Sequence, residues 1–171
     1  MDVFEAIKNR RSIRKYRSDF ISEECIRKIL DSAKWAPSAG NLQPWEFIVV
    51  TDKNVKRHLS EAALEQPFIE EAPVIIVICT NEERSARIYG TRGRHFYCLL
   101  DAAAAVQNIL LTAYALGLGT CWVGAFDDIK VAAVLKLPSG VRTIAIVPLG
   151  YADETPKPPS RFEERVQLNS Y

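Results

Sequence analysis

The sequence predicts an α+β fold: a central, mostly antiparallel sheet of about four to five strands flanked by helices. Segments with the helical spacing of apolar residues and segments with strand character follow one another along the chain. Their order lacks the even strand–helix rhythm of a doubly wound parallel sheet. With 171 residues, of which 48% are hydrophobic and 25% charged, the chain can bury a proper core. We therefore expect one domain that spans residues 1–171.

The first half of the chain alternates helix and strand signals. Ser22 is a suitable N-cap for a helix that Pro37 follows, and residues 73–80 form a continuous apolar run typical of a strand buried on both faces. Residues 45–51 are rich in β-branched side chains. The patterns predict helices over residues 2–9, 23–34 and 52–64, and strands over residues 45–51 and 73–80.

The second half is dominated by one long helix over residues 96–116, with Gly117 as its C-cap. The helix is apolar on nearly every side, so we expect it to be buried centrally and partly covered by a partner subunit. Asp101, Gln107 and Asn108 interrupt it and argue against a membrane span. Residues 81–94, which include Gly90 and Gly93, are interpreted as a mobile connection.

The remaining segments complete the sheet. Residues 120–126 fit either a third strand or an extended loop. Asp127 or Asp128 caps a helix that ends at Leu137, and residues 142–149 predict a further strand. The tail from Tyr151 is rich in proline and should lack regular structure.

Composition narrows the class of protein. A formal net charge of +1 gives no electrostatic case for nucleic acid or an anionic membrane as partner. Four scattered cysteines and two histidines contain no metal-binding spacing, so we expect no metal site. The cysteines are interpreted as small, reduced residues of the core. The N-terminus has no apolar run of the kind that marks a signal peptide. We therefore expect a cytoplasmic protein.

Two stretches carry the candidate binding groups. Residues 35–45 (WAPSAGNLQPW) present backbone N–H groups, a hydroxyl and two amides on a stiff frame. Residues 8–17 contain six basic side chains, and the forked donors of arginine suit phosphate. Simpler interpretations stay open: a solvated charge run for the basic stretch, and a helix stop before a strand for the other.

No nucleotide-binding glycine motif and no nucleophile–base pair occurs in the sequence. Scattered arginines without obvious acid–base residues suggest that a cofactor carries the reaction. Gly124, in the segment CWVG, would let a planar ligand approach the backbone closely.

The chain as a whole resembles the nitroreductase family of flavin enzymes in a short form. The motifs that carry the resemblance occur in the family's order and spacing: RRSIRKY at residues 10–16, PSAGNLQPW at 37–45, DAAAAVQN at 101–108, GLGTCWVGAF at 117–126, and PLGY at 148–151 with Arg161 beyond. Each motif alone is weak, whereas their combination is specific.

The resemblance implies a set of FMN-binding residues, with no catalytic side chain because the flavin carries the chemistry. Arg14 would stabilise negative charge on the reduced ring. The set comprises Arg10, Arg11 and Ser12 for the phosphate and ribityl chain, Arg14 near the pyrimidine, Pro37, Ser38, Ala39 and Asn41 reaching the partner's flavin, Val123, Gly124 and Ala125 facing the ring, and Arg161 as a C-terminal phosphate ligand.

Two departures from the family pattern affect recognition. Where many members have a lysine beside the flavin, this chain has Gln66 and Phe68, so we expect the Gln66 amide to assist Arg14. Pro159 stands where larger members have a basic residue. The chain also lacks much of the helical material that covers the substrate pocket in those members, which leaves the acceptor open.

The resemblance implies a homodimer with two shared flavin sites and a ping-pong reaction. NADH or NADPH would deliver hydride to flavin N5, and a nitroaromatic, quinone or other small acceptor would then take its place. Two alternatives stay open: the same flavin fold with reductive dehalogenation, flavin fragmentation or azoline oxidation, and a non-enzymatic dimeric module that binds anions.

Three further residues receive simpler interpretations. Asp101 is expected to be a buried structural carboxylate that an arginine or backbone donors satisfy. Trp122 and Phe126 are expected to fill the core, with lining of the flavin as the alternative. Residues 89–95 fit a solvated loop, with a substrate lid or a contact to the nicotinamide phosphate as the alternatives.

Overall fold

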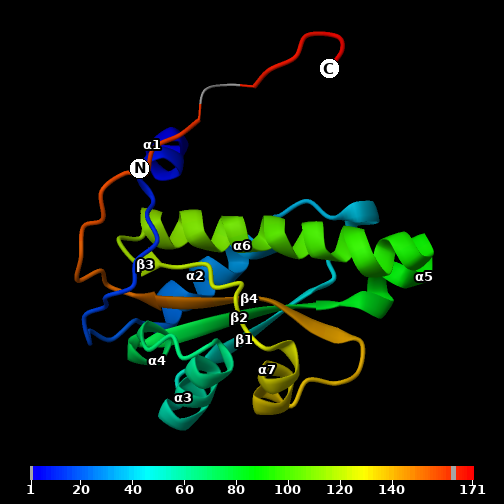
Figure 1. The fold of residues 1–171 in the computed structure, drawn as a ribbon. Helices are drawn as coiled ribbons and strands as arrows, with labels where there is room; N and C mark the ends of the chain where they lie inside the picture. The colour runs from blue at the N-terminus through cyan, green and yellow to red at the C-terminus, as the bar shows by residue number, and fades with distance from the viewer. Residues whose placement is uncertain (1, 163–164) are drawn as a thin grey trace.

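The computed structural model describes residues 2–162 and 165–171, and its centre is a four-stranded antiparallel sheet. The strand order is β1-β2-β4-β3, with β1 at Trp45–Val50, β2 at Val74–Asn81, β4 at Val141–Gly150 and the short β3 at Gly119–Thr120 (Figure 1). Residue Ile76 of β2 lies opposite Val49 of β1 and Val147 of β4. The predicted α+β class, with its antiparallel sheet, is confirmed.

Strand β2 feeds two hydrophobic layers through the alternation of its side chains. Ile76 and Ile78 join the cluster formed with helices α2 (Glu23–Lys34) and α6 (Cys98–Ala115). Ile75 and Val77 join a second cluster on the opposite face. Helices α3 (Lys53–Ala62) and α7 (Asp128–Leu135) cover that face, as Figure 1 shows. The continuous apolar run over residues 73–80 therefore marks a strand buried on both faces, as predicted.

Side-chain caps begin the helices where the sequence indicates. The Ser22 hydroxyl accepts a hydrogen bond from the Cys25 N–H at 3.2 Å, and a carboxylate oxygen of Asp127 accepts from two backbone amides of α7. At the C-terminal end of α6, Gly117 takes a left-handed φ of 79°. The helix α1 (Val3–Asn9) and the short α4 (Phe68–Glu71) complete the set.

The prediction of a mobile connection over residues 81–94 is wrong, because Asn81 ends β2 and the residues after it are helical. Asn81 caps α5 (Glu82–Arg92) by accepting from the Arg84 N–H at 3.1 Å, and a π-helix, η2 (Gly93–Tyr97), joins α5 to α6. Gly90 absorbs a kink at φ 55° and ψ −138°. A Cβ on Gly93 would lie 2.4 Å from the Ser85 carbonyl oxygen. The two glycines that suggested a loop serve a kink and a close contact instead.

Residues 120–126 follow the extended-loop alternative. Only Gly119–Thr120 counts as strand β3, and Val123 then pairs singly with Ile146 of β4 through two backbone hydrogen bonds of 2.9 and 3.0 Å. The edge of the sheet beyond β4 is therefore irregular.

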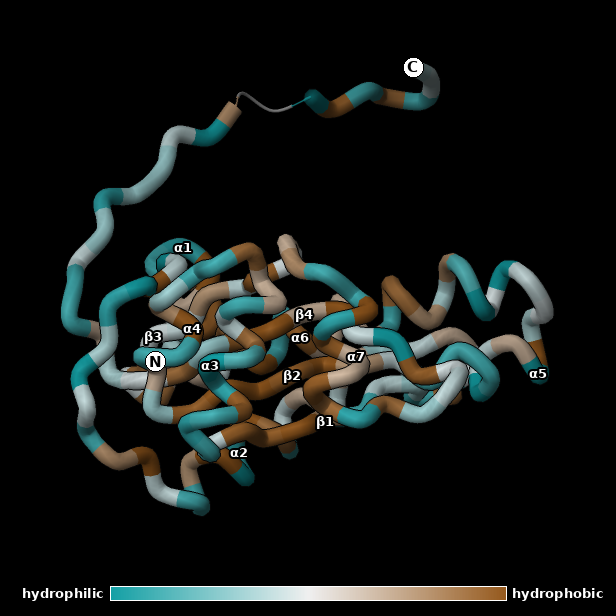
Figure 2. Tube along the Cα trace, turned by 60° about the horizontal axis from the view of Figure 1, so that its bottom comes forward, coloured by the Kyte–Doolittle hydropathy of each residue, from teal (hydrophilic) through white to brown (hydrophobic). Residues whose placement is uncertain are grey.

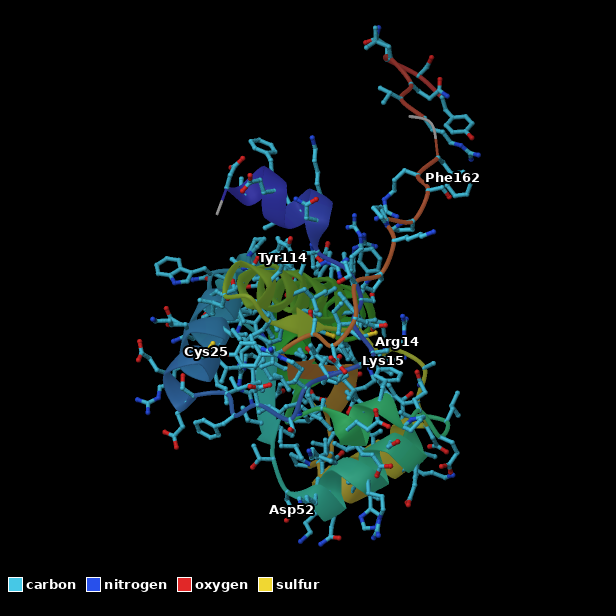
Figure 3. The ribbon with its side chains drawn as sticks, turned by 90° about the vertical axis from the view of Figure 1, so that its left-hand side faces the viewer. Arg14, Lys15, Cys25, Asp52, Tyr114 and Phe162 are labelled. Atoms are coloured by element: carbon cyan, nitrogen blue, oxygen red, sulfur yellow. The ribbon has the colours of Figure 1, made fainter. Side chains whose placement is uncertain are left out.

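The N-terminal segment of residues 12–17 lies between β3 and the start of the tail. The Ile13 N–H donates to the Thr120 carbonyl at 2.9 Å, the Arg17 N–H donates to the Tyr151 carbonyl at 2.9 Å, and the Asp153 N–H donates to the Lys15 carbonyl at 2.9 Å. Beyond these contacts the tail lacks regular structure in the residues that the structure describes, as predicted, and it leaves the body past α1 (Figures 1 and 2). Figure 3 shows Phe162 on this outlying tail.

The stretch Glu82–Ala115 is long and apolar enough to cross a membrane by length and composition alone. In this fold 44% of its most apolar window is buried, and α6 packs against α2 and the sheet. A core helix passes the same two criteria, so the stretch gives little reason to infer a membrane span.

All four cysteines are free thiols. Cys79, Cys98 and Cys121 are buried, whereas Cys25 is partly exposed. Burial raises the pKa of Cys79 to about 11 and raises the pKa of Cys121 as well. Because the thiolate is the reactive form, the three buried thiols should be inert in the native protein.

Titration of the native protein with a disulfide reagent at pH 8 should therefore show one fast thiol, Cys25, and three that react only through opening of the structure. Unfolding in guanidinium should release all four. The control variant Cys25→Ser should lose the fast phase and keep three slow thiols. Two or more fast thiols in the native protein would contradict this arrangement.

Candidate functional site

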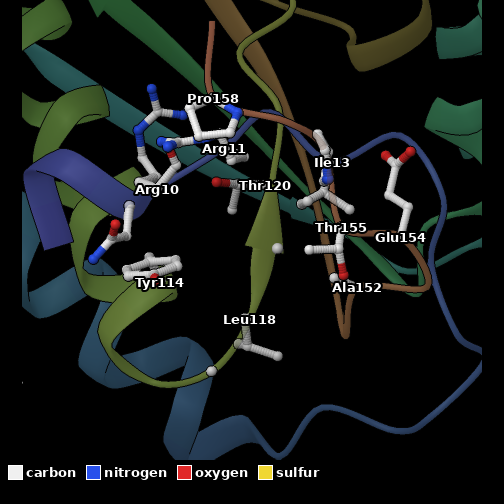
Figure 4. Close-up of a pocket in the computed structure, with 14 residues that line it drawn as sticks. Arg10, Arg11, Ile13, Tyr114, Leu118, Thr120, Ala152, Glu154, Thr155 and Pro158 are labelled. Carbon is white, nitrogen blue, oxygen red and sulfur yellow. The ribbon is translucent and has the colours of Figure 1, made fainter. Parts of the chain in front are cut away.

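A cavity of about 380 Å³ lies between the N-terminal segment, the C-terminal end of α6, β3 and the tail. Figure 4 shows Arg10 and Arg11 at one end of it and Glu154 at the other. Tyr114 of α6 and Thr120 of β3 also line the cavity. Three segments far apart in the sequence, residues 9–13, 114–120 and 152–158, therefore meet around one concave space.

Positive charge gathers at the end of this cavity that Arg10 and Arg11 line, whereas Glu154 lines the other end. Burial lowers the pKa of Arg10, and the neighbouring guanidinium groups of Arg11 and Arg161 lower it further. In the part of the chain that the structure describes, none of these three side chains forms an ion pair. A half-buried guanidinium repelled by two others is stabilised by an anion, and forked N–H donors match phosphate oxygens.

Ser12 and Arg14 lie on the other side of the same segment. Ser12 pairs with Thr120 through an isolated parallel bridge, and the side chains of Ser12 and Arg14 both lower the pKa of the buried Cys121 thiol, which burial raises. The Arg14 guanidinium stands 5.8 Å from the centre of the Phe68 ring. From Arg11 onward the alternation of side chains along an extended segment explains the division, since Arg11 and Ile13 line the cavity, as does Arg10 at the end of α1.

Glu154 of the tail fixes the backbone of this segment. Its carboxylate accepts hydrogen bonds from the backbone N–H groups of Arg14 and Lys15, at 2.5 and 3.2 Å. Glu154, Tyr114 and Thr120 could not be predicted as site residues, because no local pattern marks a glutamate in a proline-rich tail, a tyrosine in an apolar helix or a threonine in a two-residue strand.

Residues 123–125 form a strip of backbone next to the Arg14 side, in which Val123 is buried. Gly124 and Ala125 are exposed, and a Cβ on Gly124 would meet only the Trp122 indole, at 3.7 Å. Gln66 supports the strip, because its Nε2 donates to the carbonyls of Ala125 at 3.1 Å and Ala63 at 2.6 Å. A planar ligand can approach this backbone without meeting a side chain of Gly124.

The 37–41 loop is held in a specific shape. It contains the 3₁₀ turn η1 (Ala39–Asn41), and Gly40, Asn41 and the following Gln43 all have positive φ angles of 57°, 54° and 48°. The Ser38 hydroxyl accepts from the Gln43 N–H at 3.0 Å, and the Asn41 side-chain oxygen accepts from the Gln43 amide at 3.0 Å. The polar side chains of Ser38 and Asn41, which are expected to bind a ligand, thus also form hydrogen bonds that stabilise the shape of the loop.

The structure does not bring this loop to the arginine cavity of the same chain. The Ala39 N–H donates to the Asp101 carboxylate, whereas Tyr114 lines the cavity. Tyr114 stands thirteen positions after Asp101, which is about 20 Å along α6. The predicted site residues therefore form two groups at opposite ends of one helix: the 37–41 loop, and the group of Arg10, Arg11, Ser12, Arg14, Gln66, Val123, Gly124, Ala125 and Arg161.

Trp122 and Phe126, which flank the 123–125 strip, differ in burial. Trp122 is 37% exposed, so its assignment to the core is wrong, whereas Phe126 does pack against the second hydrophobic cluster. Trp122 follows the buried Cys121 in an extended segment, and alternation directs it outward. Among the described residues no three histidine, cysteine or acidic side chains are placed to hold a metal ion.

The donor set and the backbone strip fit a phosphate-bearing planar cofactor. Guanidinium groups offer the charge that a phosphate needs, and the backbone at Gly124 offers a surface that a ring can approach. The two features adjoin, because Arg10 and Arg14 both lie close enough to Cys121 to lower its pKa.

Comparison with known proteins agrees with this geometry. The model of the Nitroreductase family matches residues 7–71 and 60–151. A protein of Thermus thermophilus named NADH dehydrogenase is 36% identical over 98% of this chain and 96% of its own length.

Two solved structures have the same fold. The FMN-dependent nitroreductase of Clostridium difficile R20291 superposes with a TM-score of 0.85 at 32% identity, over 98% of this chain and 99% of that one. The NADPH:FMN oxidoreductase of Vibrio harveyi, solved with NAD⁺, superposes with a TM-score of 0.91 at 28% identity, over 99% of this chain and 77% of that one. The family match extends over most of the chain, and these structures share its whole fold: the chain belongs to the Nitroreductase family.

Proposed function

We propose that this chain is an FMN-dependent oxidoreductase that takes electrons from NADH or NADPH and passes them to a small acceptor. A nitroaromatic or a quinone is the proposed acceptor class, and a ping-pong order is proposed because reductant and acceptor would use the same face of the cofactor. The observation that carries this proposal is the pair of Arg10 and Arg11, which line the cavity, with Arg161 near enough to lower the pKa of Arg10; this positive charge calls for an anion.

The residues of this chain would bind the cofactor at both of its ends. Arg10, Arg11 and Arg161 would donate hydrogen bonds to the phosphate, and the Ser12 hydroxyl, on the other side of the segment, would bind the ribityl chain. Residues 123–125 would lie against the ring, and Gln66 would hold that strip in place through its hydrogen bond to Ala125. Bound FMN would supply the redox chemistry, accepting a hydride and releasing the electron pair to the acceptor.

Arg14 has the position of a charge stabiliser. It forms no ion pair among the described residues, and its backbone is fixed by Glu154. A guanidinium held beside the ring would favour the negative charge that two-electron reduction adds. No side chain of the protein is then needed as a nucleophile.

A homodimer with shared sites would join the two separated groups of residues. A two-fold axis across α6 would place the 37–41 loop of one subunit near the arginine cavity of the other, since the two lie at opposite ends of that helix. Exposed apolar side chains support such an interface: Val3, Phe4 and Ile7 on α1, Leu100 on α6 and Phe162 on the tail.

A cytoplasmic location and one domain over residues 1–171 complete the proposal. The three buried free thiols suit a reducing compartment. A net charge of +1 gives no reason to propose nucleic acid as a partner.

Purified protein should be yellow, or should stay yellow after FMN has been added and the unbound excess removed, and should bind FMN with quenching of its fluorescence. Arg10→Ala should weaken FMN binding by about 10- to 100-fold, because a charge-assisted hydrogen bond to the phosphate is lost. The control Arg57→Ala removes an arginine of α3, on the opposite face of the sheet, and should bind FMN normally. A colourless protein that FMN does not stabilise against heat would overturn the proposal, and unchanged FMN binding by Arg10→Ala would favour the anion-binding module.

Gly124→Ala should separate folding from binding. A Cβ at Gly124 meets no atom closer than 3.7 Å, so the apo protein should keep its melting temperature, while FMN affinity falls because the methyl group holds the ring off the backbone. Gly119→Ala provides the contrast, since its Cβ would lie 2.7 Å from the Ile13 side chain and should lower the melting temperature. Wild-type affinity in Gly124→Ala would place the ring elsewhere.

Mixed dimers test the shared site. A dimer of one Arg10→Ala chain and one Asn41→Ala chain, purified through two different tags, should bind about half of the wild-type FMN, because one site keeps both residues. Each variant homodimer should bind poorly. A mixed dimer that binds as poorly as the homodimers would assign loop and cavity of the same chain to one site.

A further inference from the structure

Asp101 is a buried carboxylate with a single protein partner. Its side chain is 7% exposed, and its Oδ1 accepts a hydrogen bond from the Ala39 N–H at 3.0 Å. Its Oδ2 is buried and has no partner among the described residues. Of the two groups expected to satisfy it, the structure provides a backbone donor and no arginine.

Burying a carboxylate is unfavourable, so the hydrogen bond that Asp101 accepts from Ala39 is the clearest explanation for its presence. Burial raises the pKa of Asp101, and the hydrogen bond from Ala39 opposes that rise only in part. The next four residues of α6 are alanines, and a fifth alanine would pack at this position without the cost of burying a charge. Packing alone therefore does not explain an aspartate here.

The 37–41 loop needs the acceptor that Asp101 provides. Ala39 is the first residue of the turn η1, and the preceding Ser38 makes no capping hydrogen bond to it, because its hydroxyl accepts from Gln43. Without Asp101 the Ala39 N–H would lose the partner that this structure gives it. The positive φ angles of Asn41 and Gln43 are unfavourable for residues with a side chain, so this loop shape has to be held by its surroundings.

A second contact holds the same turn from α5. A Cβ added to Gly40 would lie 2.7 Å from the Tyr89 hydroxyl, so the tyrosine packs directly against the loop backbone. The loop thus lies between Tyr89 of α5 and Asp101 of α6, two helices that η2 joins into one continuous unit. Its position is set by that unit.

We propose that Asp101 is a positioning residue for the cofactor site: by accepting the Ala39 N–H, it holds the 37–41 loop in the shape in which the loop reaches FMN bound to the partner subunit. This inference rests on the proposed FMN-binding function. Asp101 touches neither cofactor nor substrate, and acts only through the loop.

Three variants separate positioning from general stability. Asp101→Ala removes the acceptor, and Asp101→Asn keeps a side-chain oxygen for the Ala39 N–H. Asn108→Ala is the matched control, because the Asn108 amide of the same helix donates to the Ser32 carbonyl of α2 at 3.0 Å and makes no recorded bond to the loop. FMN affinity, the melting temperature of the apo protein and hydrogen exchange of the Ala39 amide should be measured for each.

We expect Asp101→Ala to weaken FMN binding by about 10-fold or more and to speed exchange of the Ala39 amide by a similar factor. Asp101→Asn should restore both to within about threefold of wild type. Asn108→Ala should lower the melting temperature while FMN affinity and Ala39 exchange stay near wild type. This pattern ties the effect to the loop and to the acceptor oxygen.

Other patterns would overturn the inference. Wild-type FMN affinity in Asp101→Ala would show that the loop needs no such support, and equal losses of affinity in Asp101→Ala and Asn108→Ala would show only general destabilisation. Failure of Asp101→Asn to rescue would remove the acceptor from the explanation. If Asp101→Ala does not fold, Asp101→Leu, which has a similar shape and no acceptor oxygen, takes its place, with the same expected losses of FMN affinity and of Ala39 amide protection. If the wild-type protein binds no FMN, the proposed function fails. If Ala39 exchange is unchanged in Asp101→Ala, only the positioning contact is contradicted.

Discussion

The double burial of β2 is the constraint on which the rest of this molecule depends. Its residues from Val74 to Thr80 have no face in contact with water, and each large side chain of this kind contributes about 1.5–3 kcal/mol when buried. Both faces therefore require a helical layer, and both edges require a paired strand. Loss of either layer would expose half of the strand's side chains at once, which explains why α2 and α6 must stand opposite α3 and α7. Because the centre of the sheet is fixed in this way, its structure is least regular at the edge beyond β4. At that edge β3 is two residues long, and the candidate site lies beside it.

Much of the framework could be predicted because it depends on patterns within single segments. The alternation and apolar runs of β1, β2 and β4, and the periodicity of α2, are local signals, as are the caps at Ser22 and Asp127. The helical structure of residues 82–94 could not be predicted from the local pattern, because Gly90 and Gly93 give this segment the composition of a loop. Gly90 and Gly93 instead allow a kinked helix and a contact with the Ser85 backbone.

The site could be predicted only in part, for a physical reason. Motif resemblance identified residues such as Arg10 and Gly124, whose positions stay predictions as cofactor ligands. The groups that fix them are partners from distant parts of the sequence. Glu154 is 140 residues from Arg14, and Asp101 is 62 residues from Ala39. Neither carboxylate stands in a local pattern that reveals its partner, since a hydrogen bond across the fold leaves no periodicity behind. Likewise, the division of the candidate residues between the two ends of α6 follows from packing alone.

The pairing of residues 12–17 with the tail also has a consequence for biosynthesis. The basic segment is among the first parts of the chain to leave the ribosome, yet its backbone bonds to Tyr151, Asp153 and Glu154 cannot form until those residues have been translated. For most of translation the nascent protein can build its sheet and helices while Arg10 and Arg14 stay unfixed. A ribosome that stops at residue 150 would therefore release a chain that has all of β4 but whose basic segment keeps only its backbone bond to Thr120. The chain's earliest binding residues are among its last to be fixed in place.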